Sequence, residues 1–152
     1  FIMPGFNLRP LEMEGAIGLE QLKKIDKMIA QRRRNAKYFQ SVMKKFKDIR
    51  LQKEIEESSW FGFSLVLDGK LKGKRDRLVG KLQQAGIEVR PIVAGNFTRN
   101  KVIEFMDYKI PAPLVNADDI HDNGFFIGNH SKNNFVEIDY FAEVLETALK
   151  EI

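Results

Sequence analysis

Apolar residues recur every three or four positions along two stretches of the chain, and this spacing predicts two long helices. In the first, of about five turns, the apolar stripe is Ile25, Met28, Ile29, Ala36, Phe39, Val42, Met43 and Phe46. The second is expected over 135–152. Asp26 is expected to cap the first helix, and Asn134 with Glu137 to form a capping box for the second.

Shorter apolar runs predict a small sheet. In the clearest strand, 60–67, Phe61, Phe63, Leu65 and Leu67 share one face and Trp60 lies on the other. Further strands are expected at 49–51, 87–92 and 125–128, with helices at 11–22, 74–85 and from Asn116 or Asp118 to about 124. This order of elements indicates an α+β domain with a small, mainly antiparallel sheet covered by helices.

Composition narrows the class of protein. A chain of 152 residues with 43% hydrophobic residues and 12 Phe is long enough for one domain with its own core. The absence of Cys excludes disulfides, thiolate metal sites and Cys nucleophiles, and with only two His we expect no metal site. No apolar run approaches the roughly 18 residues of a membrane span, so we expect a cytoplasmic protein without membrane contact.

Charge gives a weak indication of an anionic partner. The 25 basic and 21 acidic residues leave a net charge of +4 and are interspersed, apart from basic stretches at 32–34 and 70–77. Such stretches are usually solvated helix faces, although a positive surface also attracts nucleic acid or a nucleotide diphosphate. Arg32 falls on the apolar stripe, where we expect it to reach the surface or to pair with a carboxylate rather than to act in catalysis.

The first cluster of candidate functional residues is Asn7 with Arg9, which come directly before Pro10 and a helix start. Backbone N–H groups at such a position favour anions, and Pro suits the first helical position. The plain alternative is a loop whose polar side chains cap the helix.

Two further clusters follow strand ends. In the segment 90–99, Arg90 and Arg99 suit phosphate or carboxylate, Asn96 suits a sugar hydroxyl, and Phe97 suits stacking on a ring. The other cluster, 128–131, contains His130. Turns with exposed side chains are the structural alternative for both. The sequence contains no Ser-His-Asp order, paired carboxylates, phosphate-binding Gly loop or recognisable Schiff-base Lys, so we assign no catalytic residue to this chain.

Several motifs resemble one family. Gly5-Phe-Asn-Leu-Arg-Pro, followed by Glu14-Gly-Ala-Ile-Gly-Leu-Glu-Gln-Leu, is similar to the motif of the DegT–StrS family of pyridoxal-phosphate (PLP) sugar aminotransferases and dehydratases. Ser59-Trp-Phe-Gly-Phe, the segment 90–99 and Phe126-Ile-Gly-Asn-His resemble its nucleotide-sugar 3-dehydratase branch. That branch removes the C3 hydroxyl of a 4-keto-6-deoxyhexose, a step of deoxysugar and lipopolysaccharide O-antigen synthesis. Sugar amination is the alternative within the family.

The resemblance implies the fold-type-I architecture of aspartate aminotransferase. Residues 1–24 would be the tail of the cofactor domain and 25–152 the C-terminal small domain. An N-terminal domain carrying the anchoring residue for PLP or pyridoxamine phosphate would then be absent, and we expect this chain alone to be inactive. A homodimer through Gly5–Leu22 is also implied, and Gly15 and Gly18 suit a close helix contact there.

The resemblance also assigns roles to the candidate residues. Asn7 would reach the PLP phosphate of the neighbouring subunit, with Arg9 nearby. The segment with Arg90, Asn96, Phe97 and Arg99 would border the nucleotide-sugar pocket, and His130 would lie near the substrate entrance. An alternative of another class is a non-enzymatic module that binds nucleic acid or acidic proteins through the basic stretches, which the many acidic residues disfavour.

Overall fold

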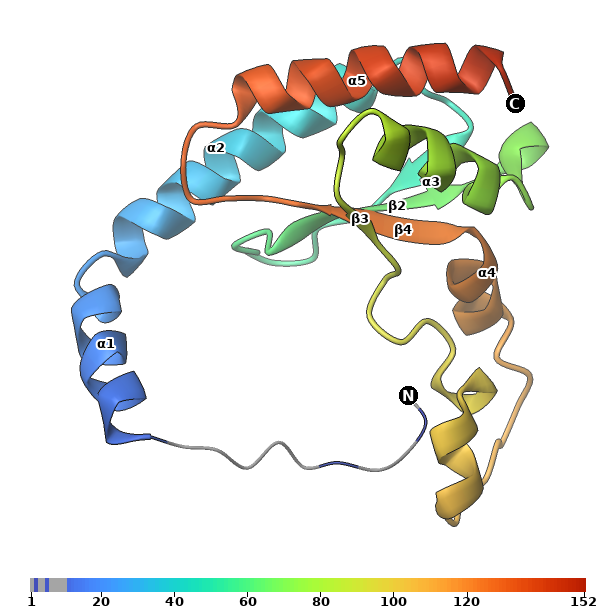
Figure 1. Cartoon of the computed structure of the whole chain (residues 1–152), viewed down its shortest axis with the longest axis horizontal. Helices are drawn as coiled ribbons and strands as arrows, with labels where there is room; N and C mark the ends of the chain where they lie inside the picture. The colour runs from blue at the N-terminus through green and yellow to red at the C-terminus, as the bar shows by residue number, and fades with distance from the viewer. Residues whose placement is uncertain (1, 3–4, 6–10) are drawn as a thin grey trace.

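A computed structural model gives the architecture and describes Ile2, Gly5 and residues 11–152. In chain order (Figure 1) the long elements are α1 (Glu12–Leu22), α2 (Ile25–Met43), β1 (Ile49–Leu51), β2 (Gly62–Leu67), α3 (Arg75–Gln84), β3 (Val89–Arg90), α4 (Val115–Asn123), β4 (Gly124–Gly128) and α5 (Phe135–Lys150). Short 3-10 turns are η1 (Gly69–Leu71), η2 (Phe97–Arg99) and η3 (Lys101–Phe105). None of the helices in the described residues is both long and apolar enough to cross a bilayer.

The strands form one antiparallel sheet in the order β1-β2-β4-β3. Helices α2, α3 and α5 cover one face of it (Figure 1), and the core lies between. Phe39 of α2 stacks on Phe63 of β2 with ring centroids 4.1 Å apart, and both side chains are 1% exposed. The predicted α+β class with an antiparallel sheet covered by helices is confirmed.

The start of β2 differs from the prediction. Trp60 has a positive φ of 52°, so the chain turns there and the strand begins at Gly62. The predicted face holds for Phe63, Leu65 and Leu67, which are buried, whereas Phe61 is 75% exposed. Trp60 is buried instead. Placing Phe61 on the same face as Phe63, Leu65 and Leu67 was wrong, because the left-handed residue before it breaks the alternation.

The predicted cap at Asp26 was wrong, whereas Asn134 is the N-cap residue of α5 as predicted but lacks the side-chain bond of a capping box. Lys24 precedes α2 without a side-chain cap, and Asp26 lies inside the first turn. At α5 the Asn134 side chain makes no cap bond; Asn133 Oδ1 accepts a hydrogen bond of 3.0 Å from the backbone N–H of Phe135. The strand expected over 87–92 shortens to Val89–Arg90, and α4 starts one residue before Asn116.

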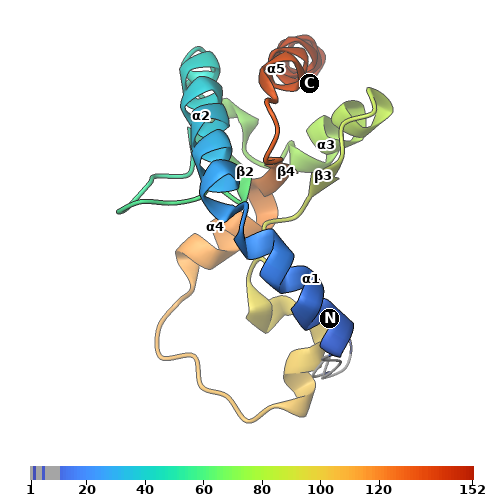
Figure 2. The same cartoon turned by 90° about the vertical axis from the view of Figure 1, so that its left-hand side faces the viewer.

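Helix α1 stands apart from the core. It extends beyond the end of α2, away from the sheet (Figure 2), and none of its residues is buried. A Cβ added at Gly15 or Gly18 would meet no atom of the described chain within 4 Å. The close contact expected at these glycines is therefore not made within the described chain.

Candidate functional site

Two of the predicted site residues, Arg90 and His130, line the same pocket. It has a volume of about 690 Å³ and lies beside β3 and the end of β4, within the size range of small-molecule sites. Helix α2 contributes Arg32 to its wall, and Phe61 and Phe126 also line it. The structure thus brings together residues that are far apart in the sequence.

A buried amide network positions the loop that carries His130. Asn35 of α2 is 0% exposed, and its Nδ2 donates to the carbonyls of His130 (3.0 Å) and Lys132 (2.7 Å) and to Asn129 Oδ1 (3.1 Å). Asn129 Nδ2 donates in turn to the carbonyls of Arg32 and Trp60. Since buried polar groups are costly to leave unpaired, these bonds fix the loop against α2 and aim its side chains at the pocket.

Arg90 and Arg32 differ in how their charge is compensated. Arg90 donates through Nε and Nη2 to Glu88 Oε1, at 2.8 and 2.7 Å, in a pair that is mostly exposed to solvent. Such exposed pairs contribute little free energy, so an anionic ligand can compete for the guanidinium. No hydrogen bond or ion pair joins the Arg32 guanidinium to another described residue. Two outcomes were expected for Arg32: that it reaches the surface or that it pairs with a carboxylate. The second is not found among the described residues.

The pocket also has an aromatic wall. Phe61, just before β2, and Phe126 of β4 lie with ring centroids 6.3 Å apart and planes at 43°. Phe61 is largely exposed, and its ring is available to a planar group. The sequence analysis did not assign three residues of this pocket to the site, namely Phe61, Phe126 and Arg32. For Arg32 a signal was available, because it interrupts the apolar stripe of its helix.

The remaining residues of the segment 90–99 do not line this pocket. Asn96 is 4% exposed, and its Nδ2 donates to Asp118 Oδ1 at 2.8 Å while its backbone N–H donates to His121 Nδ1 at 3.2 Å. Arg99 pairs with Asp122 at 2.7 Å, and Phe97 opens η2 and is 39% exposed. These contacts fasten the segment to α4. A substrate role for these three residues stays a prediction.

The predicted cofactor residues Asn7 and Arg9 lie outside the described residues. The described lysines are exposed or half-buried, and no group of three His, Cys, Asp or Glu among the described residues is arranged to hold a metal ion. The described residues by themselves do not form a site for PLP, whose aldehyde needs an anchoring amine or an equivalent base.

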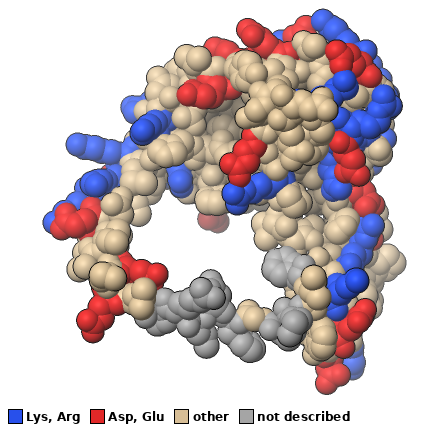
Figure 3. Space-filling view, viewed as in Figure 1, with Lys and Arg blue, Asp and Glu red and all other residues tan. Residues whose placement is uncertain are grey.

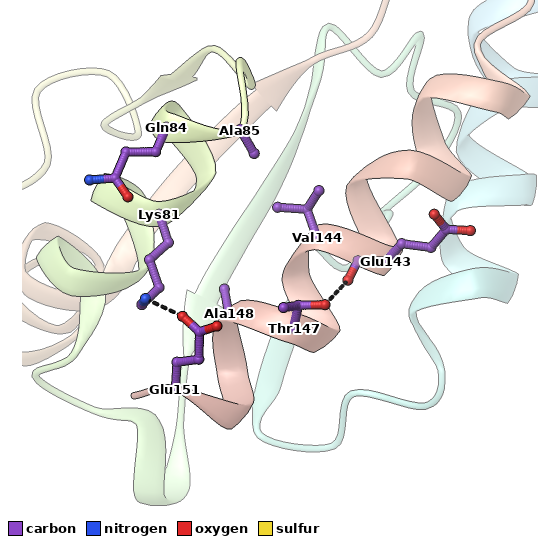
Figure 4. Close-up of a pocket in the computed structure, with 8 residues that line it drawn as sticks. All are labelled: Lys81, Gln84, Ala85, Glu143, Val144, Thr147, Ala148 and Glu151. Carbon is purple, nitrogen blue, oxygen red and sulfur yellow. Dashed lines mark hydrogen bonds and ion pairs between the residues drawn. The ribbon is translucent and has the colours of Figure 1, made fainter.

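A second hollow, of about 490 Å³, lies between α3 and α5 (Figure 4). Two of its three charged residues, Lys81 and Glu151, pair with each other, and the Thr147 hydroxyl donates to the backbone carbonyl of Glu143. Because its one cationic side chain, Lys81, is already paired with Glu151, this groove offers an anionic ligand less than the pocket lined by Arg32 and Arg90 does.

Several cations of the basic stretches pair with carboxylates, among them Arg33 with Glu57. On the face shown in Figure 3, Lys and Arg are interspersed with Asp and Glu. In the stretch 70–77, Lys72 contacts Asp119 at 3.1 Å and Arg75 contacts Asp76 at 3.0 Å. This pairing favours the interpretation of these stretches as solvated faces over a nucleic-acid interface.

Comparison with known proteins places the chain in a family. The model of the DegT/DnrJ/EryC1/StrS aminotransferase family matches residues 2–146. The GDP-4-keto-6-deoxy-D-mannose 3-dehydratase of Escherichia coli O55:H7 is 49% identical over 150 residues, which cover 96% of this chain and 38% of that protein.

Solved structures agree with that match. The E. coli GDP-4-keto-6-deoxy-D-mannose-3-dehydratase with bound hydrated PLP superposes with a TM-score of 0.85 at 49% identity, over 95% of this chain and 38% of that one. A mutant of GDP-4-keto-6-deoxymannose-3-dehydratase (ColD) with bound GDP-perosamine gives 0.85 at 48% identity, with the same coverage. The chain belongs to the DegT/DnrJ/EryC1/StrS family and spans less than two-fifths of the length of these relatives.

Proposed function

We propose that this chain supplies the small domain of a PLP- or pyridoxamine-phosphate-dependent 3-dehydratase that acts on a nucleotide-linked 4-keto-6-deoxyhexose. The observation that carries the proposal is the 49% identity to a GDP-4-keto-6-deoxy-D-mannose 3-dehydratase across 96% of the chain. Residues 1–24 would belong to the cofactor domain and 25–152 to the small domain; the exposed α1 supports this division.

In this enzyme the described residues would bind and orient the nucleotide end of the substrate. Arg90 would exchange Glu88 for a phosphate oxygen, since a guanidinium fork matches phosphate geometry. Phe61 would offer its exposed ring to the base, and His130 would lie at the entrance. The cofactor, when bound, supplies the electron sink that lets the C3 hydroxyl leave. Its phosphate would be held by Asn7, with Arg9 nearby.

We also propose that the enzyme is a homodimer that buries the Gly5–Leu22 region. In support, the apolar residues Met13, Ile17, Leu19 and Leu22 of α1 are between 59% and 73% exposed in this chain. Glycines 15 and 18 leave room for another backbone beside the helix. A cytoplasmic location fits a substrate that is a charged nucleotide sugar.

The test is a turnover assay of the whole protein that carries this chain, with the GDP-linked 4-keto-6-deoxyhexose, PLP and an amino donor. Detection of the 3-deoxy sugar by mass spectrometry is expected, and an amino sugar retaining its C3 hydroxyl would instead establish the aminotransferase alternative. Arg90→Ala should raise KM roughly 10-fold or more with little change in kcat, since it removes a charge-assisted bond. An unchanged KM would remove Arg90 from the site.

A further inference from the structure

Arg32 is a half-buried arginine whose charge is not compensated by any described residue. Its Nε is fully buried and has no hydrogen-bond partner in the described chain. Its neighbours on α2 do have acceptors: Arg33 donates to the carbonyl of Ser58 at 3.0 Å and pairs with Glu57, and Arg34 donates to the side-chain oxygen of Gln31. Because a buried donor without an acceptor is destabilising, Arg32 calls for an acceptor that is not among the described residues.

The carboxylates of the pocket do not supply this acceptor. Glu88 is engaged by Arg90, and Glu137, which also lines the pocket, makes no ion pair with Arg32 within 4.0 Å. The backbone of Arg32 is held in place, since its carbonyl accepts from Asn129 Nδ2 at 3.1 Å. The backbone of Arg32 is thus fixed, and its side chain lines a pocket that is open to a ligand.

We propose that Arg32 binds a phosphate group of the nucleotide diphosphate, opposite Arg90. This inference rests on the proposed function and adds a specificity residue to the same pocket. Arg32 and Arg90 both line the pocket and reach it from different elements, α2 and β3. Two guanidinium groups match the two phosphates of a nucleoside diphosphate in charge and geometry. The neighbouring pair of Phe61 and Phe126 offers apolar surface for the base.

The experiment measures the binding of GDP and of guanosine to the whole protein that carries this chain, by isothermal titration calorimetry. Arg32→Gln should weaken GDP roughly 10- to 100-fold, the range for a charge-assisted hydrogen bond, and leave guanosine unchanged. Arg34→Gln is the matched control, since it removes the same charge from the same helix outside the pocket. It should leave both affinities unchanged.

A second variant separates charge from geometry. Arg32→Lys keeps the positive charge but lacks the Nε–H, so its GDP affinity should fall between those of the wild type and Arg32→Gln. In turnover, Arg32→Gln should raise KM without lowering kcat, because the residue contacts the non-reacting end of the substrate. Thermal unfolding of each variant shows whether it is folded.

The outcomes that overturn the inference are distinct from those that overturn the proposed function. If the wild type binds GDP and Arg32→Gln binds it equally well, only the role of Arg32 fails. An equal loss of GDP and guanosine, or an equal effect of Arg34→Gln, would also refute it. A folded Arg32→Gln variant that loses stability but no affinity would show that the guanidinium is satisfied by protein. A wild type that binds no GDP overturns both.

Discussion

Helices α1 and α2 follow one another in the chain, yet they are packed in opposite ways. Phe39 and Met43 of α2 are 1% and 2% exposed, whereas Met13 and Ile17 of α1 are 73% and 61% exposed. The more apolar of the two helices is the one left outside the core.

The difference lies in how the apolar residues are arranged. Those of α2 fall on one stripe, which faces α5 and the sheet. Those of α1 are spread around the helix, a distribution typical of helices enclosed on several sides. Within the described residues, α2 therefore packs through its apolar stripe, whereas the apolar side chains of α1 stay exposed, as the homodimer proposed above would require.

The sharpest test of this contrast truncates one apolar side chain in each region. Phe63→Ala should lower the free energy of unfolding by about 3–5 kcal/mol, because it removes a ring stacked on Phe39 and leaves a cavity. Ile17→Ala should change it by less than about 0.5 kcal/mol in this chain, as expected for an exposed site. Urea denaturation of the 152-residue chain measures both. Similar losses for the two variants would show that α1 is part of the core.

Much of the core could be predicted from the sequence because it depends on local periodicity. The three- and four-residue spacing of α2 and the alternation from Phe63 to Leu67 both predict a buried face, and the structure has it. Trp60 shows where this fails. Its positive φ accompanies a buried indole whose Nε1 donates to Glu54 Oε1 at 3.1 Å, and periodicity does not encode such a contact.

The pocket was less predictable for a physical reason. Arg90 and His130 were singled out from the sequence because they lie in polar clusters after strand ends, and a family resemblance then gave them roles. Arg32 joins them only because Asn35 and Asn129 fasten the loop of His130 to α2. Hydrogen bonds between residues 94 positions apart leave no periodic signal. Asn96 illustrates the converse, since a polar residue in a loop turned out to be buried against α4.

A smaller effect is expected when the exposed face of α1 is made unsuitable for burial. Ile17→Glu should raise the dissociation constant of the proposed homodimer at least roughly tenfold, because an interface would have to desolvate the carboxylate. Sedimentation velocity of the whole protein measures this. Val136→Glu, an apolar-to-acidic change at a 79% exposed site of α5, is the control and should leave association unchanged. A dimer that persists in Ile17→Glu would place the interface elsewhere.

The smallest expected effect concerns Asp119 of α4, which is ion-paired with Arg50 and Lys72. Burial alone would raise the pKa of Asp119, but bonds from Lys72, Arg50 and Asn123 outweigh it, and the pKa is lowered. Lys72 Nζ lies 3.1 Å and Asn123 Nδ2 3.0 Å from its Oδ1. A carboxyl whose pKa is lower in the folded state stabilises the fold above its unfolded pKa of about 3.9.

That stabilisation should be lost as the pH falls through the folded pKa, because the proton then binds both states. Asp119→Asn should therefore cost up to about 1 kcal/mol at pH values near 7 and progressively less below about pH 4. Unfolding of wild type and variant across this range measures the difference, with Asp107→Asn, at an exposed site, as the charge-matched control. A cost that does not depend on pH would mean that Asp119 acts through its shape and neutral hydrogen bonds. Charge pairing would then add nothing to the stability of the core, which would rest on the apolar packing that α1 lacks.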